Sequence, residues 1–443
     1  MALPRRLVAF ASAVVIGVAC PAVLARTGAQ RRQVRLDTDF AVRGVATFRD
    51  LGVSQIHHFQ FVATDDYDRH IYVAGYGETS AIARFDLLGR PDETFGNGGV
   101  APIPVPGSVW QLSAVGGVVV CGSFAAPEGS GIEGSVGAVR LLPDGSGLDP
   151  TFGTDGMLDL GVPDGRPRPV LLSDLARDPR DGSYVALAST DIVQNVAEVG
   201  LIRFSRDGVV DPAFGGDGYV EIALSGIGSQ PRDLAVDSAG RAIVAIPDGT
   251  IRFHADGTRD LTFGHVGVLA DADRNTMHIS HLAITDGDGI VALGSPANAR
   301  GGVYRFDAYG DPDETFGRSG RIRLPSRSRG ARLGGSAFAL VRTGLFGLAT
   351  GDQVFLAGKV TYPAGNHPEK SHEGWYGELV SDTGARAVSV YTRRNPRPWP
   401  EQRAWITDAV PVPHGVVVVG TMEEFTPGGE VDSPFLVKFT FDE

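Results

Sequence analysis

Seven short apolar stretches are spread along the chain, and six of them carry a polar side chain at one aligned position. Aligned on their apolar residues, the stretches place these residues at the equivalent position: Gln60, Gln111, Asp174, Asp233, His281, Ala339 and Asp408. Aromatic and basic residues lie close to it in the sequence: Trp110, Arg232, His278, Arg403 and Trp405. Converging carboxylates and an imidazole can bind a cation, a sugar or a basic group, and paired carboxylates can act as general acid and base. The alternative is that these positions are polar because they line a water-filled channel.

A repeated phrase must position these residues, and it is most complete at residues 201–222. Residues 201–204 alternate apolar and polar side chains like a half-buried strand, and Asp207-Gly208 is a turn pair. A pattern Asp-x-(Thr/Ala)-Phe-Gly follows, in which the carboxylate can accept bonds from nearby backbone N–H groups and the aromatic ring is a buried plug. The plugs are Phe95, Phe152, Phe214, Phe263 and Phe316. The phrase therefore predicts a strand, a structured loop and a strand.

Each module predicts four short strands, which is the count for one propeller blade. The signal for the third strand appears seven times, centred on Phe85, Leu141, Phe204, Phe253, Phe306, Leu379 and Phe439. Sixty Gly and 28 Pro favour turns over helices. The sequence predicts an all-β chain that forms a single seven-bladed β-propeller over residues 35–443.

The two ends of the repeat array predict how the ring closes. Residues 36–48 match the second half of the phrase without its first half, whereas residues 435–441 supply a third strand with no fourth strand after it. We expect these two segments to pair in one blade, because pairing removes exposed sheet edges.

The phrase resembles the repeat of the delta-60 family, bacterial repeats of the form Arg-(Leu/Phe)-x-x-Asp-Gly-x-x-Asp-x-x-Phe-Gly-x-x-Gly. Five copies match well, and residues 380–393 and the C-terminal copy depart from the pattern. The resemblance implies a β-propeller in an exported protein and implies no reaction. A looser similarity to NHL-type propellers points to the same fold.

Residues 1–25 are predicted to be a signal peptide, because two arginines precede an apolar run and Val23-Leu24-Ala25 suits a signal peptidase. An uncleaved anchor and lipidation of Cys20 are the alternatives. Residues 26–34 form a short polar lead-in. We therefore expect an exported protein of the periplasm, the outer surface or the medium, with no transmembrane span in the mature chain.

The formal net charge of −12 excludes nucleic acid as the expected partner. Cleavage after Ala25 would leave Cys121 as the only cysteine, so an intramolecular disulfide cannot form. Separately, we expect the protein to be a monomer. The sequence contains no phosphate-binding loop, zinc-type spacing or nucleophile elbow. Residues 361–374 carry two His and two Glu, and we interpret this segment as a solvated loop and not as a metal site. We expect no metal or cofactor. A structural cation in the channel is the one possibility that the sequence leaves open.

Variable loops between second and third strands are predicted at residues 123–137, 189–200, 361–374 and 421–434, on one rim of the propeller. The leading interpretation is a non-catalytic binding or scaffold propeller of the bacterial cell envelope, with a protein or glycan partner on this loop-rich face. The alternative is an extracytoplasmic hydrolase or lyase that acts on a glycan through Asp174 and Asp233, with His281 or Asp408 assisting.

Overall fold

The chain is seen in a computed structural model that describes much of the predicted propeller. The described residues are 34–41, 44–47, 56–65, 69–77, 80–105, 107–114, 117–124, 135–161, 171–189, 199–222, 231–246, 249–265, 267–270, 277–296, 301–323, 327–328, 331–341, 353–362, 372–380, 386–391, 404–426 and 429–441. All of them are in strands, turns or loops, and none belongs to a helix that could cross a membrane. The predicted signal peptide and most of the lead-in lie outside these ranges.

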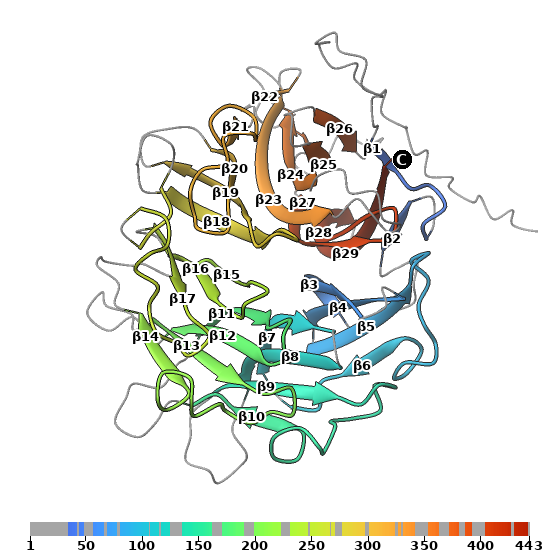
Figure 1. Cartoon of the computed structure of the whole chain (residues 1–443). Helices are drawn as coiled ribbons and strands as arrows, with labels where there is room; N and C mark the ends of the chain where they lie inside the picture. Colours follow the sequence, from blue (N-terminus) through green and yellow to red (C-terminus); the bar gives the residue numbers. More distant parts are fainter. Residues whose placement is uncertain are drawn as a thin grey trace, which may run out of the picture.

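Small antiparallel sheets are arranged around a common centre (Figure 1), which is the architecture of a β-propeller. The first sheet has the order β3 (Ile56–Thr64), β4 (His70–Gly77), β5 (Ser80–Asp86), β6 (Val100–Pro102). The second contains β7 (Gly107–Ser113), β8 (Val118–Phe124), β9 (Ser135–Leu141) and β10 (Met157–Asp159). The third contains β11 (Leu171–Arg177), β12 (Tyr184–Ser189), β13 (Val199–Phe204) and β14 (Tyr219–Ile222). The fourth contains β15 (Asp233–Val236), β16 (Ala242–Ile246) and β17 (Gly249–Phe253).

Two further sheets precede the last one. The fifth contains β18 (Met277–Ile284), β19 (Ile290–Pro296), β20 (Gly302–Phe306) and β21 (Arg321–Arg323). The sixth contains β22 (Arg327–Ser328), β23 (Ala331–Val341), β24 (Gln353–Tyr362), β25 (His372–Val380) and β26 (Arg386–Tyr391). The prediction of an all-β chain built as a propeller of small sheets is confirmed.

The last sheet combines strands from both ends of the described chain. It contains β27 (Ala404–Val412), β28 (Gly415–Thr426) and β29 (Gly429–Phe441), and both β1 (Val34–Leu36) and β2 (Val45–Thr47) pair with β29. In the register, Val34 lies opposite Phe441 and Val45 lies opposite Val437. The N-terminal strands therefore complete a sheet whose other strands come from the end of the chain (Figure 1).

The repeated aromatic residue is a buried plug in the five units that carry the repeated phrase, as predicted. Phe95, Phe152, Phe214, Phe263 and Phe316 are each at most 1% exposed. Apolar clusters pack between neighbouring sheets, and one of them joins Phe59 and Val73 of the first sheet to Val417 and Leu436 of the last. Burial of aromatic and aliphatic side chains between sheets is thus the main source of stability. The buried Cys121 has no disulfide partner among the described residues, so no disulfide contributes there.

The Phe-Gly turn of one sheet is hydrogen-bonded to the Asp-Gly turn of the next. Gly96 N–H donates to Asp144 O at 2.6 Å, and Gly153 N–H donates to Asp207 O at 2.8 Å. A Cβ on Gly96 would lie 2.1 Å from Val100 O, and its φ of +56° is one that glycine adopts readily. The repeated glycine is therefore required by a close backbone approach.

One predicted loop is wrong. Residues 421–434 were expected to form a variable loop, but β28 continues to Thr426 and β29 begins at Gly429, with Thr421 opposite Pro434 and Phe425 opposite Glu430. The two strands stay paired as far as Thr426 opposite Gly429, so the segment extends the hairpin of β28 and β29. Residues 125–134, 190–198 and 363–371 of the other predicted loops lie outside the described residues.

Candidate functional site

The first strand of most sheets carries a β-bulge just before the aligned position. The register of β11 skips from Leu172 to Asp174, and that of β27 skips from Ile406 to Asp408. A bulge re-aims the side chain that follows it. On β8 and β19, the residue opposite the bulge is glycine, because a Cβ on Gly122 would lie 2.0 Å from Ser108 O and one on Gly294 would lie 2.5 Å from His278 O.

Asp174 and Asp233 lie together on neighbouring first strands. Asp174 accepts hydrogen bonds at Oδ1 from Gln111 Nε2 and Leu175 N–H, both at 2.7 Å, and at Oδ2 from Leu234 N–H at 2.7 Å. Leu234 N–H also donates to Asp233 Oδ1 at 2.9 Å. One backbone N–H thus lies between the two carboxylates and holds them in contact.

Each channel carboxylate joins its own strand to the next first strand. Asp233 accepts from Leu234 N–H in its own strand and from Leu282 N–H on β18. Asp408 repeats the arrangement, since it accepts from Ala409 N–H at 2.8 Å and from Val62 N–H on β3 at 2.9 Å. We call these bonds inter-sheet clasps.

Burial and mutual repulsion shift the proton affinities of this cluster. Burial, followed by the charge of Asp174 and a hydrogen bond with it, raises the pKa of Asp233 well above its ordinary value. Burial raises the pKa of Asp408 to about 7, against the opposing effect of its two backbone donors. Burial lowers the pKa of His281, whose Nδ1 lies 3.8 Å from Asp233 Oδ2. The site therefore favours the protonated form of Asp233 and the neutral form of His281.

The structure brings Gln111, Asp174, Asp233 and His281 together, whereas two aligned positions need correction. Gln60 is the residue that the second bulge of β3 skips, and Phe61 takes the equivalent position. On β23 the bulge lies between Gly335 and Ala337, so Ala337 is equivalent, two residues before the predicted Ala339. Bulges were not anticipated in the alignment, and a one-residue skip moves a side chain to the other face.

The predicted neighbours of the cluster are dispersed. Trp110 is half-buried and packs against the core between the second and third sheets, while Arg232 and His278 are exposed. Arg403 and the side chain of Trp405 lie outside what the structure describes. None of these residues is therefore seen to complete a pocket above the carboxylates.

The clasps restrict what this cluster can do chemically. Every Asp174 and Asp233 oxygen accepts at least one hydrogen bond, which leaves few lone pairs for a cation, and no group of three metal-binding side chains occurs among the described residues. The adjacent carboxyl groups resemble a dyad that shares a proton, a chemistry suited to general acid–base work.

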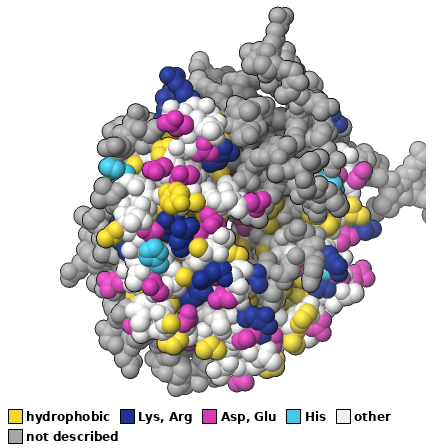
Figure 2. Space-filling view, viewed as in Figure 1, with side chains coloured by type: hydrophobic (Ala, Val, Ile, Leu, Met, Phe, Trp, Pro, Cys, Tyr) yellow, Lys and Arg dark blue, Asp and Glu magenta, His cyan; other side chains and the backbone are white. Residues whose placement is uncertain are grey.

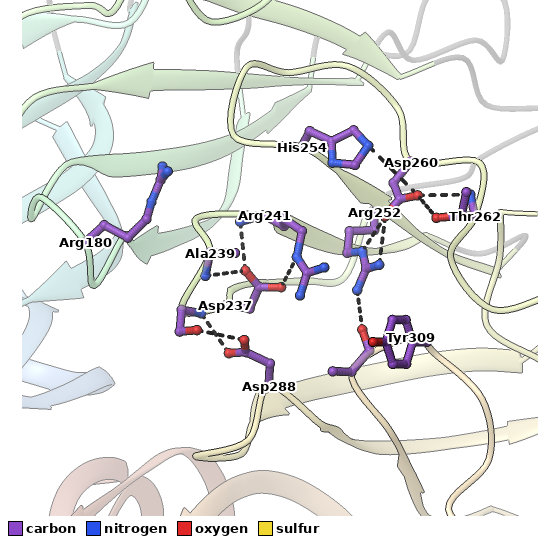
Figure 3. Close-up of polar contacts among 12 residues, drawn as sticks. Arg180, Asp237, Ala239, Arg241, Arg252, His254, Asp260, Thr262, Asp288 and Tyr309 are labelled. Carbon is purple, nitrogen blue, oxygen red and sulfur yellow. Dashed lines mark hydrogen bonds and ion pairs between the residues drawn. The ribbon is translucent and has the colours of Figure 1, made fainter.

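A second polar network was overlooked in the sequence, although its arginine is part of the repeat. Arg252 donates from Nε and Nη2 to Asp260 Oδ2 at 2.9 and 2.7 Å, and from Nη1 to Ala308 O of the next sheet at 2.6 Å (Figure 3). Its guanidinium also lies 4.3 Å from the centre of the Phe263 ring. Burial would raise the pKa of Asp260, but hydrogen bonds from Thr262 and Arg252 lower it to about 2. The ionised pair therefore ties the plug, the loop and the next sheet together.

Similar networks surround Arg84, Arg140 and Arg305. The third sheet departs from them, because its loop has Ala213 where the others have Thr. Arg203 turns to Asp178 and Asp181 at 2.8 and 3.0 Å, and its buried Nη1 lacks a hydrogen-bond partner.

The visible face of the molecule mixes acidic and basic side chains, without one large patch of either sign among the described residues (Figure 2). Within the described part of the chain, four large hydrophobic side chains are exposed: Leu88, Val209, Leu261 and Tyr309. All four belong to the turns and loops between third and fourth strands, so this end of the sheets also offers contact surface.

Comparison with known proteins found only remote structural similarity. No protein-family model matches the chain, and no curated protein matches its sequence. A protein of unknown function from Dyadobacter fermentans has 12% identity and a TM-score of 0.41, covering 92% of this chain and 99% of that one. A subtype N11 neuraminidase-like protein of A/flat-faced bat/Peru has 10% identity and a TM-score of 0.35 over 86% and 88% of the two chains. A gluconolactonase from Xanthomonas campestris has 13% identity and a TM-score of 0.24 over 60% and 86%. Identities and TM-scores this low carry no argument about activity.

Proposed function

We propose that the chain is an exported binding or scaffold propeller whose sheets are the seven blades of one closed ring. The closure is supported by contacts between successive first strands, among them β27 with β3 and β18 with β23. It is also supported by the pairing of β1 and β2 with β29 and by the clasp from Asp408 to Val62. A closed ring of packed sheets is a rigid platform for loops.

A non-catalytic role is favoured because the channel carboxylates hydrogen-bond to backbone amides and so serve a structural purpose. Asp174, Asp233 and Asp408 bond backbone amides of two strands each, so the side chains best suited to catalysis hold the ring together. Removing them is expected to unfold or loosen the protein before it removes a reaction. The observation that carries this proposal is the N–H of Leu234, which both Asp174 and Asp233 share.

The test is a binding screen of the purified mature protein against glycan, peptide and metal-ion panels. Any ligand found is retested on Asp174→Asn and on Asp207→Asn, an exposed control 61% accessible to solvent. We expect ligand affinity to survive in both variants while Asp174→Asn loses thermal stability. Loss of affinity in a folded Asp174→Asn protein would indicate that the ligand binds in the channel.

A glycan hydrolase or lyase is the second candidate, because the raised pKa of Asp233 beside Asp174 provides an acid next to a base. The two groups share one N–H, which places their oxygens too close for a glycosidic bond to fit between them. This candidate therefore requires Asp408 or His281 as the partner. Turnover of a glycan that Asp233→Asn abolishes without a change in melting temperature would establish it.

Export is tested separately. N-terminal sequencing of protein from the native source should give a first residue near Arg26, recovered outside the cytosol. A chain that keeps Met1 in the cytosol would contradict export and leave the ring itself intact.

A further inference from the structure

Asn97 is the only asparagine of the sequence that is followed by glycine, and it lies in the turn just before β6. Both Asn97 and Gly98 are exposed to solvent. The other copies of the repeated phrase have a different residue at this position: Thr154, Gly216, His265 and Arg318. The Asn-Gly step is therefore a feature of the first sheet alone.

The turn from Asn97 to Val100 is held mainly from one side. Asn97 N–H donates to Val100 O at 2.7 Å, but the return bond from Val100 N–H to Asn97 O is 3.4 Å long, beyond the usual range. The equivalent turn of the second sheet is tighter, since Thr154 N–H donates to Met157 O at 2.7 Å and Met157 N–H donates back at 3.0 Å. The backbone that follows the Asn97 side chain is thus loosely fixed.

The backbone nitrogen of Gly98 is accessible. Within the described part of the chain, neither the Gly98 N–H nor the Asn97 side-chain amide makes a hydrogen bond. Many glycines that follow an aspartate instead donate this N–H to a carbonyl oxygen of their own turn: Gly145, Gly156, Gly182, Gly208, Gly218 and Gly257. A Cβ on Gly98 would meet nothing within 4 Å. The nitrogen next to the Asn97 side chain therefore has neither a bonding partner nor steric cover among the described residues.

We propose that Asn97 is a site of spontaneous deamidation through a succinimide. Asparagine is a thermolabile residue, and a following glycine lets the backbone approach closely. Hydroxide removes the Gly98 N–H proton, the nitrogen attacks Cγ of Asn97, and the N–Cγ bond forms as the Cγ–Nδ2 bond breaks. The departing nitrogen takes a proton from water, which restores the hydroxide, and leaves as ammonia. Water then opens the ring at Cγ to give aspartate, or at the backbone carbonyl to give isoaspartate.

The two products differ in their effect on the first sheet. Aspartate adds a charge at an exposed position, whereas isoaspartate also adds a methylene group to the backbone before Gly98. The added length separates the bonded groups of Asn97 and Val100, and Val100 begins β6, where it pairs with Ala83. Gly96, directly before the site, donates its N–H to Asp144 O of the second sheet. Isoaspartate should therefore loosen β6 and its contact with the next sheet.

The experiment ages the full mature protein at neutral and at mildly alkaline pH and follows each asparagine-containing peptide by mass spectrometry, with enzymatic methylation to detect isoaspartate. Residue 97 should convert before any other asparagine, and its rate should rise with the hydroxide concentration. Asn97→Thr copies the residue of the second unit and should abolish the signal. Gly98→Ala keeps the asparagine but places a Cβ beside the attacking nitrogen, so conversion should slow several-fold.

A sample unfolded in urea is the reference for the effect of the fold. Conversion of residue 97 in urea but not in the native protein would overturn the proposal, because the turn would then protect the site. Equal conversion of all asparagines, or an unchanged rate in Gly98→Ala, would overturn it as well. If Gly98→Ala fails to fold, Asn97→Gln keeps an amide that must close a larger ring, and it should show the same slowing.

The effect of the added methylene group is measured against Asn97→Asp, which has the charge of the product on a normal backbone. Aged parent protein should melt below Asn97→Asp once isoaspartate has accumulated. Equal melting temperatures would contradict the loosening of β6. The inference is independent of the proposed binding role, and the ligand screen tests that role separately.

Discussion

Asp408 Oδ2 accepts a hydrogen bond from the backbone N–H of Val62, which lies 346 residues earlier in the chain. The bond joins β27 of the last sheet to β3 of the first at the centre of the molecule. Asp408 is therefore placed where its charge state affects the contact between two sheets that are remote in sequence.

Stability should rise as pH falls through about 7 because of Asp408. Its pKa in the folded protein is raised to about 7, so folding favours the protonated form, and stability present at low pH is lost as pH rises through that value. This contribution, up to about 4 kcal/mol, is fully present below about pH 4 and is lost between about pH 4 and 7, so about 2 kcal/mol of it is lost above pH 5.5. Urea unfolding between pH 5.5 and 8.5 should show a flatter profile for Asp408→Asn. His281 has a lowered pKa and acts in the opposite sense, so the difference between the two proteins is the quantity to measure.

Asp144→Asn is the control for that experiment. Asp144 is exposed, and hydrogen bonds from Ser146 lower its pKa, so it stays ionised throughout the range. Its pH profile should match the parent protein. An unchanged profile for Asp408→Asn would contradict the assignment.

Asp174→Ala should destabilise the protein by about 2–4 kcal/mol, because it removes the acceptor of the Gln111 amide and of the Leu175 N–H and leaves the Leu234 N–H with Asp233 alone. Asp207→Ala, at an exposed position, should change stability by about 0.5 kcal/mol or less. Chemical denaturation measures both. Equal effects would mean that the clasp contributes nothing beyond a surface charge.

Phe214→Ala should cost about 3–5 kcal/mol, since the ring is 1% exposed at the contact between sheets. Val209→Ala is the matched control in the same repeat, because Val209 is 62% exposed. Calorimetry of both proteins gives the comparison. A loss below about 1 kcal/mol for Phe214→Ala would show that the cavity collapses or that the ring is not a plug.

Thr94→Ala should cost about 1 kcal/mol, and Ala213→Thr should return about the same amount. The Thr94 hydroxyl accepts from Arg84 Nη2 and donates to Asp92 Oδ1, at 2.9 and 2.6 Å. Ala213 lacks the hydroxyl beside Asp211, where Arg203 Nη1 has no partner. If Thr94→Ala lowers the melting temperature but Ala213→Thr lowers it as well, the packing of the third sheet has adapted to alanine.

Turn and plug residues were the features that the sequence predicted best, because their types follow from local backbone chemistry. The glycine after Phe95, the Asp-Gly turns and the buried phenylalanines each have one structural role that repeats. The resemblance to delta-60 repeats, the signal peptide and the ring of seven blades stay predictions.

The candidate site was predicted in part, because side-chain type says little about which backbone amide a carboxylate will meet. The proximity of Asp174 and Asp233 was predicted from their equivalent positions. Their role as clasps depends on β-bulges, which residue types alone do not predict. Gln60 was misplaced for the same reason, whereas Ala339 was taken two residues too late in its strand. The repeated arginine was visible, yet its bond to the next sheet required the fold.

The pairing of Val34 with Phe441 also imposes an order on folding. During synthesis, sheets three and four can form as soon as their own strands leave the ribosome, because their pairings are local. Among the described strands, β1 and β2 pair only with β29, so this strand pairing must wait until the end of translation, although Phe40 can already pack against the first sheet. The slowest step should be the docking of this last sheet, and protease sensitivity of residues 34–47 in nascent chains should disappear only when residue 441 has emerged.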